Sequence, residues 1–206
     1  MKHLVILAAA VVVAATVLSA LPVRGEEAIY DSVIRLHVLA ESDSAEDQAD
    51  KLAVRDAILP VAAQELDGCE SRDSASARLE ELIPTLEQVA ERTLRQRGTD
   101  AVVTVTLGQE EYPTRAYEGF CFPAGEYLSL RVMIGEAKGQ NWWCVLFPSL
   151  CLSVANGGSA EQLEEAFVAV GLTPEQYRII TESDENTPYR LRFKVLELLE
   201  AWRRGR

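Results

Sequence analysis

The sequence is poor in the residues that build metal centres and nucleic-acid surfaces. Only two of its 206 residues are histidine and four are cysteine, and no two cysteines have the C-x-x-C spacing of a zinc ribbon. Basic residues number 20 against 32 acidic ones, which gives a formal net charge of −12. Such a chain lacks the positive footprint that binds nucleic acid or anionic lipid. We therefore expect no metal, no cofactor and no nucleic-acid partner.

The scarcity of histidine also limits the catalytic sets that the chain can assemble. His37 is the only histidine beyond the N-terminal segment, so a thiol enzyme would have to pair it with Cys144 or Cys151. Cys144 lies in an apolar stretch, where a thiol is usually inert. A metal site at His37 would need scattered carboxylates that are better explained as helix-start residues. The simpler interpretation makes His37 and Arg35 a half-buried polar pair on one strand face, and we predict no enzyme.

The first 25 residues have the features of a targeting segment. A short basic start at Lys2 precedes an uncharged run from Leu4 to Val23, and charged residues follow. This order is typical of an export signal, while the run is near the length that spans a bilayer. A cleaved signal and an uncleaved anchor both stay open. In either case we expect the body to lie outside the membrane of the cell that makes it, with residues 1–25 as its only membrane contact.

The four cysteines permit two disulfides in an exported chain. Cys144 and Cys151 lie on either side of the Phe147-Pro148 step, and they are the candidate pair that would close the end of one strand. The alternative is that the cysteines are small buried hydrophobic residues. The sequence leaves both open.

Hydrophobic periodicity predicts a strand and two long helices in the first half of the body. Residues 32–40 alternate with period two, as in a strand with one apolar face. A helix follows, with a capping-box pattern at Ser44 or, in a second register, at Asp43, and residues 74–96 carry the apolar stripe of a second helix. One proline lies inside each helix and predicts a kink or a break there, at Pro60 and Pro84.

The second half of the body predicts a strand, a hairpin and a helical tail. Residues 100–111 are rich in Val and Thr, and a loop with prolines and glycines leads on to a hairpin with its turn at 135–140. The return strand, 141–147, has no charge and is apolar on both faces. It is therefore either central in a sheet covered on both sides, or covered on one side and adhesive on the other.

This order of elements indicates an α+β fold, with an antiparallel or mixed sheet of about four strands packed with helices. We divide the chain into three parts. Residues 1–25 are an export signal or membrane anchor, residues 26–152 form the α+β core domain, and residues 153–206 form a helical C-terminal segment packed on or beside that core.

Polar residues near the strand ends are candidates for partner binding. Arg115 and Tyr117 lie in the stretch PTRAY, and Glu126 and Tyr127 lie in AGEY. Rigid sheets commonly present binding groups on the loops that leave them. The alternative is a loop buttressed by its own arginine and tyrosines.

Two adjacent tryptophans, Trp142 and Trp143, preceded by Asn141, complete the candidate partner-binding set. On a regular strand their indoles point to opposite faces. One fills the core, and the other lies under a helix or is exposed. Exposed aromatic side chains in a neighbourhood without charge mark interfaces. Which tryptophan belongs to the core and which to an interface stays open.

Three stretches resemble the stage II sporulation protein R family of endospore-forming bacteria. They are IRLHVLAESDSAEDQADKLAVRDAIL, then PTRAY with FPAGEYLSLRVMIGEAKGQNWWCVLFPSLC, then RFKVLELLE. The resemblance is strong over about residues 30–152 and looser in the tail. The chain departs from the pattern at Ala137, where glycine or another small residue is expected, and at Ser149, where proline is expected.

The resemblance implies a signal rather than an enzyme. A family member is made in the forespore and exported across its membrane into the space between the two cells. There it activates a membrane-embedded aspartic protease of the mother cell, which cleaves the precursor of a mother-cell sigma factor. The family offers no catalytic residues to transfer, so the binding residues above are chosen by side-chain type. The alternative function is a cell-envelope hydrolase, or a cell-wall-binding module whose aromatic side chains stack on sugars.

Overall fold

The structure is a computed structural model that describes residues 11, 26–117, 120–148, 160–169, 172, 173, 177 and 179–181. The predicted export segment apart from Val11, the tail beyond residue 181 and Cys151 lie outside these residues. The elements in chain order are α2 (Glu26–Ser32), β1 (Ile34–Leu39), α3 (Ala45–Leu66), α4 (Arg72–Arg97), β2 (Val103–Tyr112), β3 (Arg115–Tyr117), β4 (Phe120–Phe122), β5 (Gly125–Ile134), β6 (Asn141–Phe147) and α6 (Ala160–Ala169).

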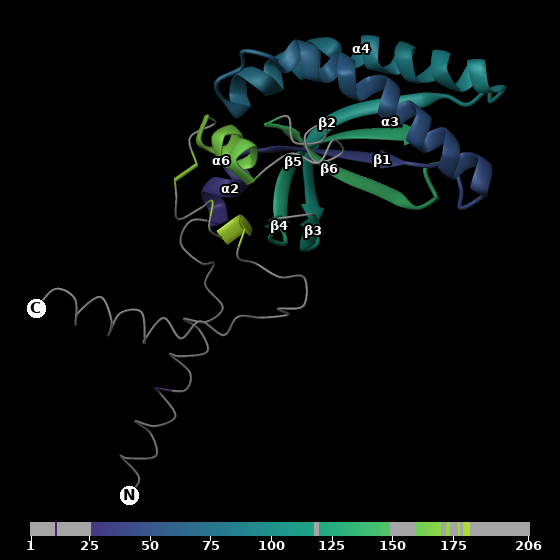
Figure 1. Ribbon diagram of the computed structural model, residues 1–206. Coiled ribbons are helices and arrows are strands. Elements are labelled where there is room, and N and C mark those ends of the chain that lie inside the picture. The colour runs from purple at the N-terminus through teal and green to yellow at the C-terminus, as the bar shows by residue number, and fades with distance from the viewer. Residues whose placement is uncertain are drawn as a thin grey trace, which may run out of the picture.

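Four strands form one mixed sheet in the order β2-β5-β1-β6 (Figure 1). β1 and β5 run parallel, with Leu36 opposite Leu130, whereas the β2-β5 and β1-β6 pairs are antiparallel. A parallel pair needs a long crossover connection, and α3 and α4 lie in the crossover between β1 and β5. The predicted α+β fold with a mixed sheet is therefore confirmed. The predicted loop after β2 carries the short hairpin β3-β4.

Serine caps set where the two long helices begin. The Ser44 side chain accepts a hydrogen bond from the backbone N–H of Asp47 at 3.0 Å, so α3 starts where the capping pattern predicted. α4 starts earlier than predicted because Ser71, rather than Ser74, is its N-cap. These two serines form a reciprocal capping box.

Pro60 and Pro84 lie inside α3 and α4, and both helices continue through them. Of the predicted kink or break, the break is therefore wrong. A proline removes one backbone donor and crowds the preceding turn. Both prolines are exposed on the outer side of their helices, where the carbonyl that loses its partner is open to water.

The main core lies between the sheet and the two helices, which lie side by side over one face (Figure 1). Burying one Leu or Val side chain contributes about 1.5–3 kcal/mol. The fully buried residues of this core include Leu36, Val38, Leu79, Leu86, Leu94, Leu130 and Val132. Their spacing on each strand is two residues, so the opposite face of the sheet carries a different set of side chains.

A second apolar cluster lies on the opposite face, at the end covered by α2, the β3-β4 hairpin and α6 (Figure 1). Its buried members include Ile29, Phe122, Tyr127, Phe167 and Ile180. Toward the β5-β6 turn, no described helix covers this face. The face is thus apolar and closed at one end, and polar and more open at the other.

β6 is an edge strand, and β1 is its strand partner among the described residues. Of the two alternatives that the sequence left open for this strand, the central position is therefore excluded. β1 takes the central place because it pairs with β5 through the helical crossover and with β6 on its other side. β6 lacks charge because side chains on both of its faces pack against an apolar cluster.

The turn at residues 135–140 holds β6 in register. The backbone N–H of Gly139 donates to the carbonyl of Ala40 at 2.9 Å. A Cβ at Gly139 would overlap the carbonyl oxygen of Ser42, so this close approach requires glycine. Ala137 in the same turn has a φ of 52°, in the left-handed region where glycine is favoured. The departure from the family pattern at this position therefore has a backbone cost.

Candidate functional site

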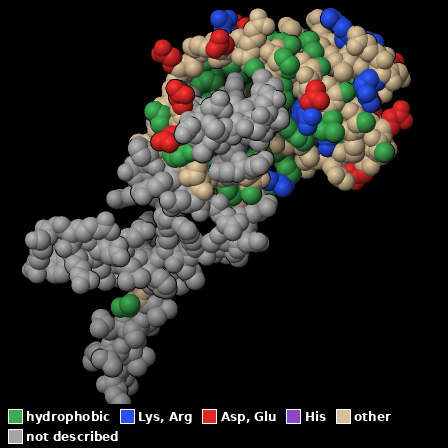
Figure 2. Space-filling view, in the orientation of Figure 1, with side chains coloured by type: hydrophobic (Ala, Val, Ile, Leu, Met, Phe, Trp, Pro, Cys, Tyr) green, Lys and Arg blue, Asp and Glu red, His purple; other side chains and the backbone are tan. Residues whose placement is uncertain are grey.

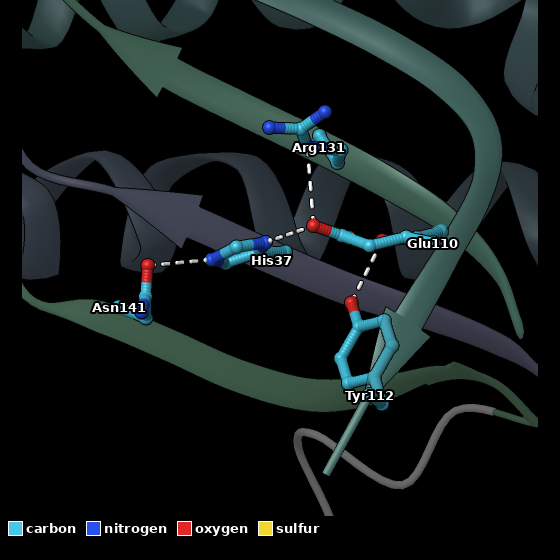
Figure 3. Close-up of polar contacts among 6 residues, drawn as sticks. His37, Glu110, Tyr112, Arg131 and Asn141 are labelled. Atoms are coloured by element: carbon cyan, nitrogen blue, oxygen red, sulfur yellow. Dashed lines mark hydrogen bonds and ion pairs between the residues drawn. The ribbon is translucent and has the colours of Figure 1, made fainter. Parts of the chain in front are cut away.

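The candidate site lies on the sheet face opposite α3 and α4, at its more open end. Strand alternation brings side chains from four strands and the β3-β4 hairpin together there. We call this surface the polar face, and it is defined by His37, Glu110, Arg115, Arg131, Asn141 and Trp143. Figure 3 shows how four of these side chains join in one network of polar contacts.

His37 is buried at the centre of the polar face, and both of its ring nitrogens have an oxygen partner. Nδ1 lies 2.8 Å from Glu110 Oε1, and Nε2 lies 2.8 Å from Asn141 Oδ1 (Figure 3). A neutral imidazole has one N–H, so it cannot donate to both oxygens. Either the ring carries two protons, or the Asn141 amide turns so that its NH₂ group donates to Nε2. The polar pair that the sequence predicted for His37 and Arg35 is instead a bridge from His37 to β2 and β6.

Glu110 connects His37 to Arg131. Its Oε1 lies 3.3 Å from Arg131 Nε as well as 2.8 Å from the histidine ring. Burial on its own raises the pKa of Glu110. Hydrogen bonding from His37 and Ser129 and the charges of His37 and Arg131 outweigh that effect, and the pKa lies below its ordinary value. The carboxylate is therefore charged at neutral pH, and it holds β1, β2 and β5 together at this point.

Arg35 is fully buried under aromatic rings at the covered end of the same face. Its Cζ lies 4.4 Å from the ring centre of Tyr112, 5.0 Å from that of Phe122 and 5.1 Å from that of Tyr127. Its Nη2 donates to the Tyr117 hydroxyl at 2.8 Å. The β3-β4 hairpin is thus fixed to the sheet by an arginine of β1. The buttress that the sequence assigned to the loop's own arginine comes from outside the loop.

Tyr112 and Ser129 form a hydroxyl pair beside this arginine. The two oxygen atoms are 2.7 Å apart, and both residues are buried. Burial, the largest influence, raises the pKa of Tyr112 well above its ordinary value. The phenol is neutral at physiological pH, and it serves as a hydrogen-bonding and packing group.

Trp143 carries an arginine on its indole. The Cζ of Arg115, from β3, lies 3.9 Å from the ring centre, and the ring centre of His37 lies 5.3 Å from that of Trp143. Trp143 is half-buried and belongs to the second apolar cluster. Arg115 has no hydrogen bond or ion pair with any described residue, and its Nε is buried.

Trp142 lies on the helix-covered face, so the two indoles do point to opposite sides of β6. It is half-buried against the main core, and Arg55 of α3 stacks on it with Cζ 4.8 Å from the ring centre. Arg55 also donates from Nε to Asp56 Oδ1 at 2.7 Å. Each tryptophan therefore has one arginine, and each meets an apolar cluster.

The remaining candidate residues lie away from the polar face. Tyr127 is fully buried and donates its hydroxyl proton to the carbonyl of Pro123 at 2.7 Å. Tyr117 is half-buried and accepts from Arg35. Glu126 is exposed, and strand alternation places it on the same side of β5 as Leu128, the side that faces the helices.

The cysteine and histidine that a thiol enzyme would pair lie on different faces. Cys144 stands opposite Leu36 in the β1-β6 register and packs in the main core, whereas His37 lies on the polar face. Cys144 is buried, and Cys151 lies outside the described residues, so the candidate disulfide stays a prediction.

Sequence reasoning missed three residues of this region, namely Arg35 as an aromatic-caged cation, Glu110 and Arg131. Alternation alone places Arg35 and His37 on one face, but it does not say which residues of other strands lie opposite them. The β1-β5 and β2-β5 registers supply that information. In the part of the chain that the structure describes, no cluster of His, Cys, Asp or Glu has the makings of a metal site. Among the same residues, no helix is long and apolar enough to cross a bilayer.

The fold and the polar face define an α+β domain with a mixed sheet, closed by a helical pair on one side and carrying a polar, aromatic surface on the other. The chain belongs to the family described as stage II sporulation protein R, whose family model matches residues 30–156. It is 34% identical over 138 residues to the stage II sporulation protein R of Bacillus subtilis (strain 168). That alignment covers 66% of this chain and 62% of the relative, a little under two thirds of the relative's length. No solved structure matches the chain.

Proposed function

We propose that the chain is an exported signal of sporulation that activates a membrane-embedded aspartic protease by direct contact, leading to cleavage of the mother-cell sigma factor precursor. The chain would act in the space between forespore and mother cell, with residues 1–25 as export signal or anchor. Family membership supports a role in sporulation. The contact mechanism is our own inference from the surface of the domain.

One observation supports the proposal, namely the half-exposed Trp143 with Arg115 on its indole, an arginine that has no acidic partner among the described residues. Tryptophan and arginine are the residues most often found at the energetic centre of protein interfaces. Trp143 lies in a strand of the four-stranded sheet, and Arg115 of the β3-β4 hairpin is stacked on it, so ordering these side chains for binding costs little conformational entropy. The surface is therefore suited to recognising a protein partner.

Activation by contact is a shift of population between two states of the protease. The signal must bind the active state more tightly than the inactive one. Moving that equilibrium from 1:99 to 99:1 takes about 5.5 kcal/mol of differential binding. Interface hot spots contribute about 2–4 kcal/mol each, so two or three side chains of the polar face are sufficient.

The test is co-expression of the full chain with the septal protease and the sigma precursor in a host that does not sporulate. We expect the precursor to be cleaved only when all three are present. Trp143→Ala should abolish cleavage while the purified variant keeps the circular dichroism of the wild type. Absence of cleavage with the wild-type chain would count decisively against the proposal.

Two controls make this test specific. A chain without residues 2–25 should fold and yet leave the precursor intact, because it stays on the wrong side of the membrane. Sedimentation with purified peptidoglycan addresses the alternative of a wall-binding module. If the wild-type chain sediments with peptidoglycan, Trp143→Ala does not, and co-expression gives no cleavage, the chain is a wall-binding module instead.

A further inference from the structure

Two arginines of the polar face differ in their acidic partners: among the described residues Arg115 has none, and Arg131 shares Glu110 with His37. The sequence contains 32 acidic and 20 basic residues. On the face of the molecule seen in Figure 2, acidic and basic side chains are interspersed rather than gathered by sign. Arg115 nevertheless has no carboxylate partner in the described part of the chain, and Arg131 shares only an oxygen that His37 already holds.

The guanidinium of Arg115 is oriented by its contact with the Trp143 ring. Its guanidinium lies over the Trp143 indole at 3.9 Å, which fixes the plane of its fork of N–H donors. A guanidinium that is already oriented loses little entropy when it binds a carboxylate through two parallel hydrogen bonds. The buried Nε of Arg115 has no hydrogen-bond partner. The terminal N–H groups of Arg115 also form no hydrogen bond or ion pair with a described residue, and they, rather than the buried Nε, are the donors for an external carboxylate.

The guanidinium of Arg131 is oriented by an ion pair with Glu110 rather than by a ring. Its Nε faces Glu110 Oε1 at 3.3 Å, and in Figure 3 its two terminal nitrogens point away from that carboxylate. The side chain is 39% exposed. The ion pair fixes the inner part of the guanidinium, and the terminal N–H groups remain available to an external acceptor.

The charge of this face is opposite to that of the whole chain. Among the described residues, Arg115 and Arg131 contribute two positive charges to the polar face and Glu110 contributes one negative charge, while the buried Arg35 adds a third positive charge at the covered end. The formal net charge of the chain is −12. Anionic membranes and nucleic acids present dense negative charge over a wide area, which such a chain repels. A few carboxylates on a flexible segment act locally, within about 8–10 Å at physiological salt.

We infer that the polar face binds an acidic segment of the partner protein, with Arg115 and Arg131 each taking a carboxylate and Trp143 packing against the segment between them. The inference rests on the proposed function for the identity of the partner. The ligand chemistry, a pair of side-chain carboxylates on a peptide, follows from the two arginines alone.

The first experiment measures binding without the protease. The probe is a fluorescein-labelled peptide of sequence Thr-Glu-Val-Thr-Glu-Val, and its twin carries Gln in place of Glu. The purified full chain should bind the Glu peptide about tenfold more tightly than the Gln twin, because a bidentate carboxylate pair is lost in the twin. Arg115→Gln and Arg131→Gln should each reduce that ratio, and Arg92→Gln, an exposed arginine of α4, should leave it unchanged.

The second experiment uses charge reversal in the co-expression system. Arg131→Glu should reduce precursor cleavage at least about tenfold, while Arg92→Glu retains it. The Arg131→Glu variant is then combined with protease variants in which one acidic residue of an outward-facing segment is replaced by Arg. One of these combinations should restore cleavage. Arg131→Glu places a second carboxylate beside Glu110, so its thermal midpoint should fall, and cleavage is compared at a temperature where circular dichroism shows the variant to be folded. Arg115→Gln gives the same test at the stacked site without a new carboxylate.

The outcomes separate the two proposals. Cleavage with the wild-type chain but equal binding of both peptides and full activity of Arg131→Glu overturns the acidic-segment inference and leaves the function in place. No cleavage with the wild-type chain removes the proposed function, while the peptide ratio still decides the ligand chemistry. Binding to phosphatidylglycerol vesicles that Arg131→Gln abolishes, without discrimination between the peptides, would assign the face to lipid instead.

Discussion

The two tryptophan–arginine stacks on β6 differ in the state of the arginine. Arg55, which lies over Trp142, also bonds to Asp56 at 2.7 Å. Arg115, which lies over Trp143, has no acidic partner in the described chain. The two adjacent tryptophans thus carry an arginine with an acidic partner on one face, and an arginine without a described acidic partner on the other. Both stacks contain one tryptophan and one arginine, so their composition does not distinguish a stack that serves packing from one that serves binding. The presence or absence of a carboxylate partner for the arginine does distinguish them.

The same contrast extends over the whole sheet. The helix-covered face is apolar, and its central side chains have no contact with water. The polar face is built from hydrogen bonds and ion pairs among partly exposed groups, each of which contributes only modestly to stability. Stability therefore resides in the main core and in the second apolar cluster, and the polar face beside that cluster is free to serve recognition.

Leu36 and His37 test this contrast most strongly, because they are consecutive in β1 and face opposite sides. Leu36→Ala removes a fully buried side chain from the main core and should lower the free energy of unfolding by about 2–5 kcal/mol. His37→Ala should cost about 1–2 kcal/mol, since it removes two hydrogen bonds from a polar network whose other members are partly exposed. Urea unfolding of both variants measures the difference. Equal losses would mean that the polar face is as structural as the core, and the contrast would fail.

The two tryptophans give the next largest effect. Trp142→Ala should lower the free energy of unfolding by about 2–3 kcal/mol. The half-buried indole packs on the main core, and its removal leaves a cavity that the neighbouring side chains fill only in part. Precursor cleavage by this variant should fall only in proportion to its folded fraction. Trp143→Ala should show the reverse pattern, with cleavage lost and most of the stability kept. A Trp142→Ala variant that is stable and inactive would move the interface to the other face.

The β5-β6 turn decides which tryptophan faces which side, since a slip of one residue exchanges the two faces of a strand. Gly139→Ala would place a methyl group against the carbonyl of Ser42, and we expect a loss of about 1–3 kcal/mol as the turn shifts. Gly108→Ala in β2 is the matched control, because a methyl group at that position would have no neighbouring atom within 4 Å. Thermal unfolding of the two variants compares them directly. Similar midpoints would show that the turn adapts without cost.

Glu110 gives the polar face a dependence on pH. Its pKa is lower in the folded state than the ordinary value of about 4.3, so its charge stabilises the fold above that pH. This contribution is lost as the pH falls through the lowered pKa. Glu110→Gln should therefore cost about 1 kcal/mol at pH 7 and nothing near pH 2. Urea midpoints of the two proteins over this range measure the convergence. A constant difference at every pH would assign the effect of the substitution to packing.

Local signals in the sequence predicted much of the fold. The alternation of residues 32–40 defines the two faces of β1, and the cap at Ser44 defines the start of α3. These features depend on neighbours within one turn or one strand. The break expected at the prolines did not occur, because exposure on the outer helix surface removes most of the penalty.

The candidate site was less accessible to sequence reasoning, because its contacts are non-local. Glu110 meets His37 across 73 positions of the chain, and the meeting depends on the strand order β2-β5-β1-β6. Nothing in the spacing of either residue encodes that order. Trp143 was found because its residue type is rare and its strand uncharged. Arg131 was missed because a single arginine in an alternating strand is typical of a solvated face.

Ala137 provides the smallest test, and it concerns the turn that fixes the register of β6. Its φ of 52° costs an L-residue about 1–2 kcal/mol, and glycine avoids that cost while losing about 0.5–1 kcal/mol through its freer unfolded chain. Ala137→Gly should therefore raise the free energy of unfolding by about 0.5 kcal/mol. Gly135→Ala is the reciprocal control, because Gly135 has a φ of 54° and a Cβ there meets the Glu41 carboxyl group at 2.7 Å. Urea midpoints should move in opposite directions for the two variants. If Ala137→Gly lowers the midpoint, the alanine is held by packing that outweighs its backbone strain, and the family pattern at this position reflects something other than φ.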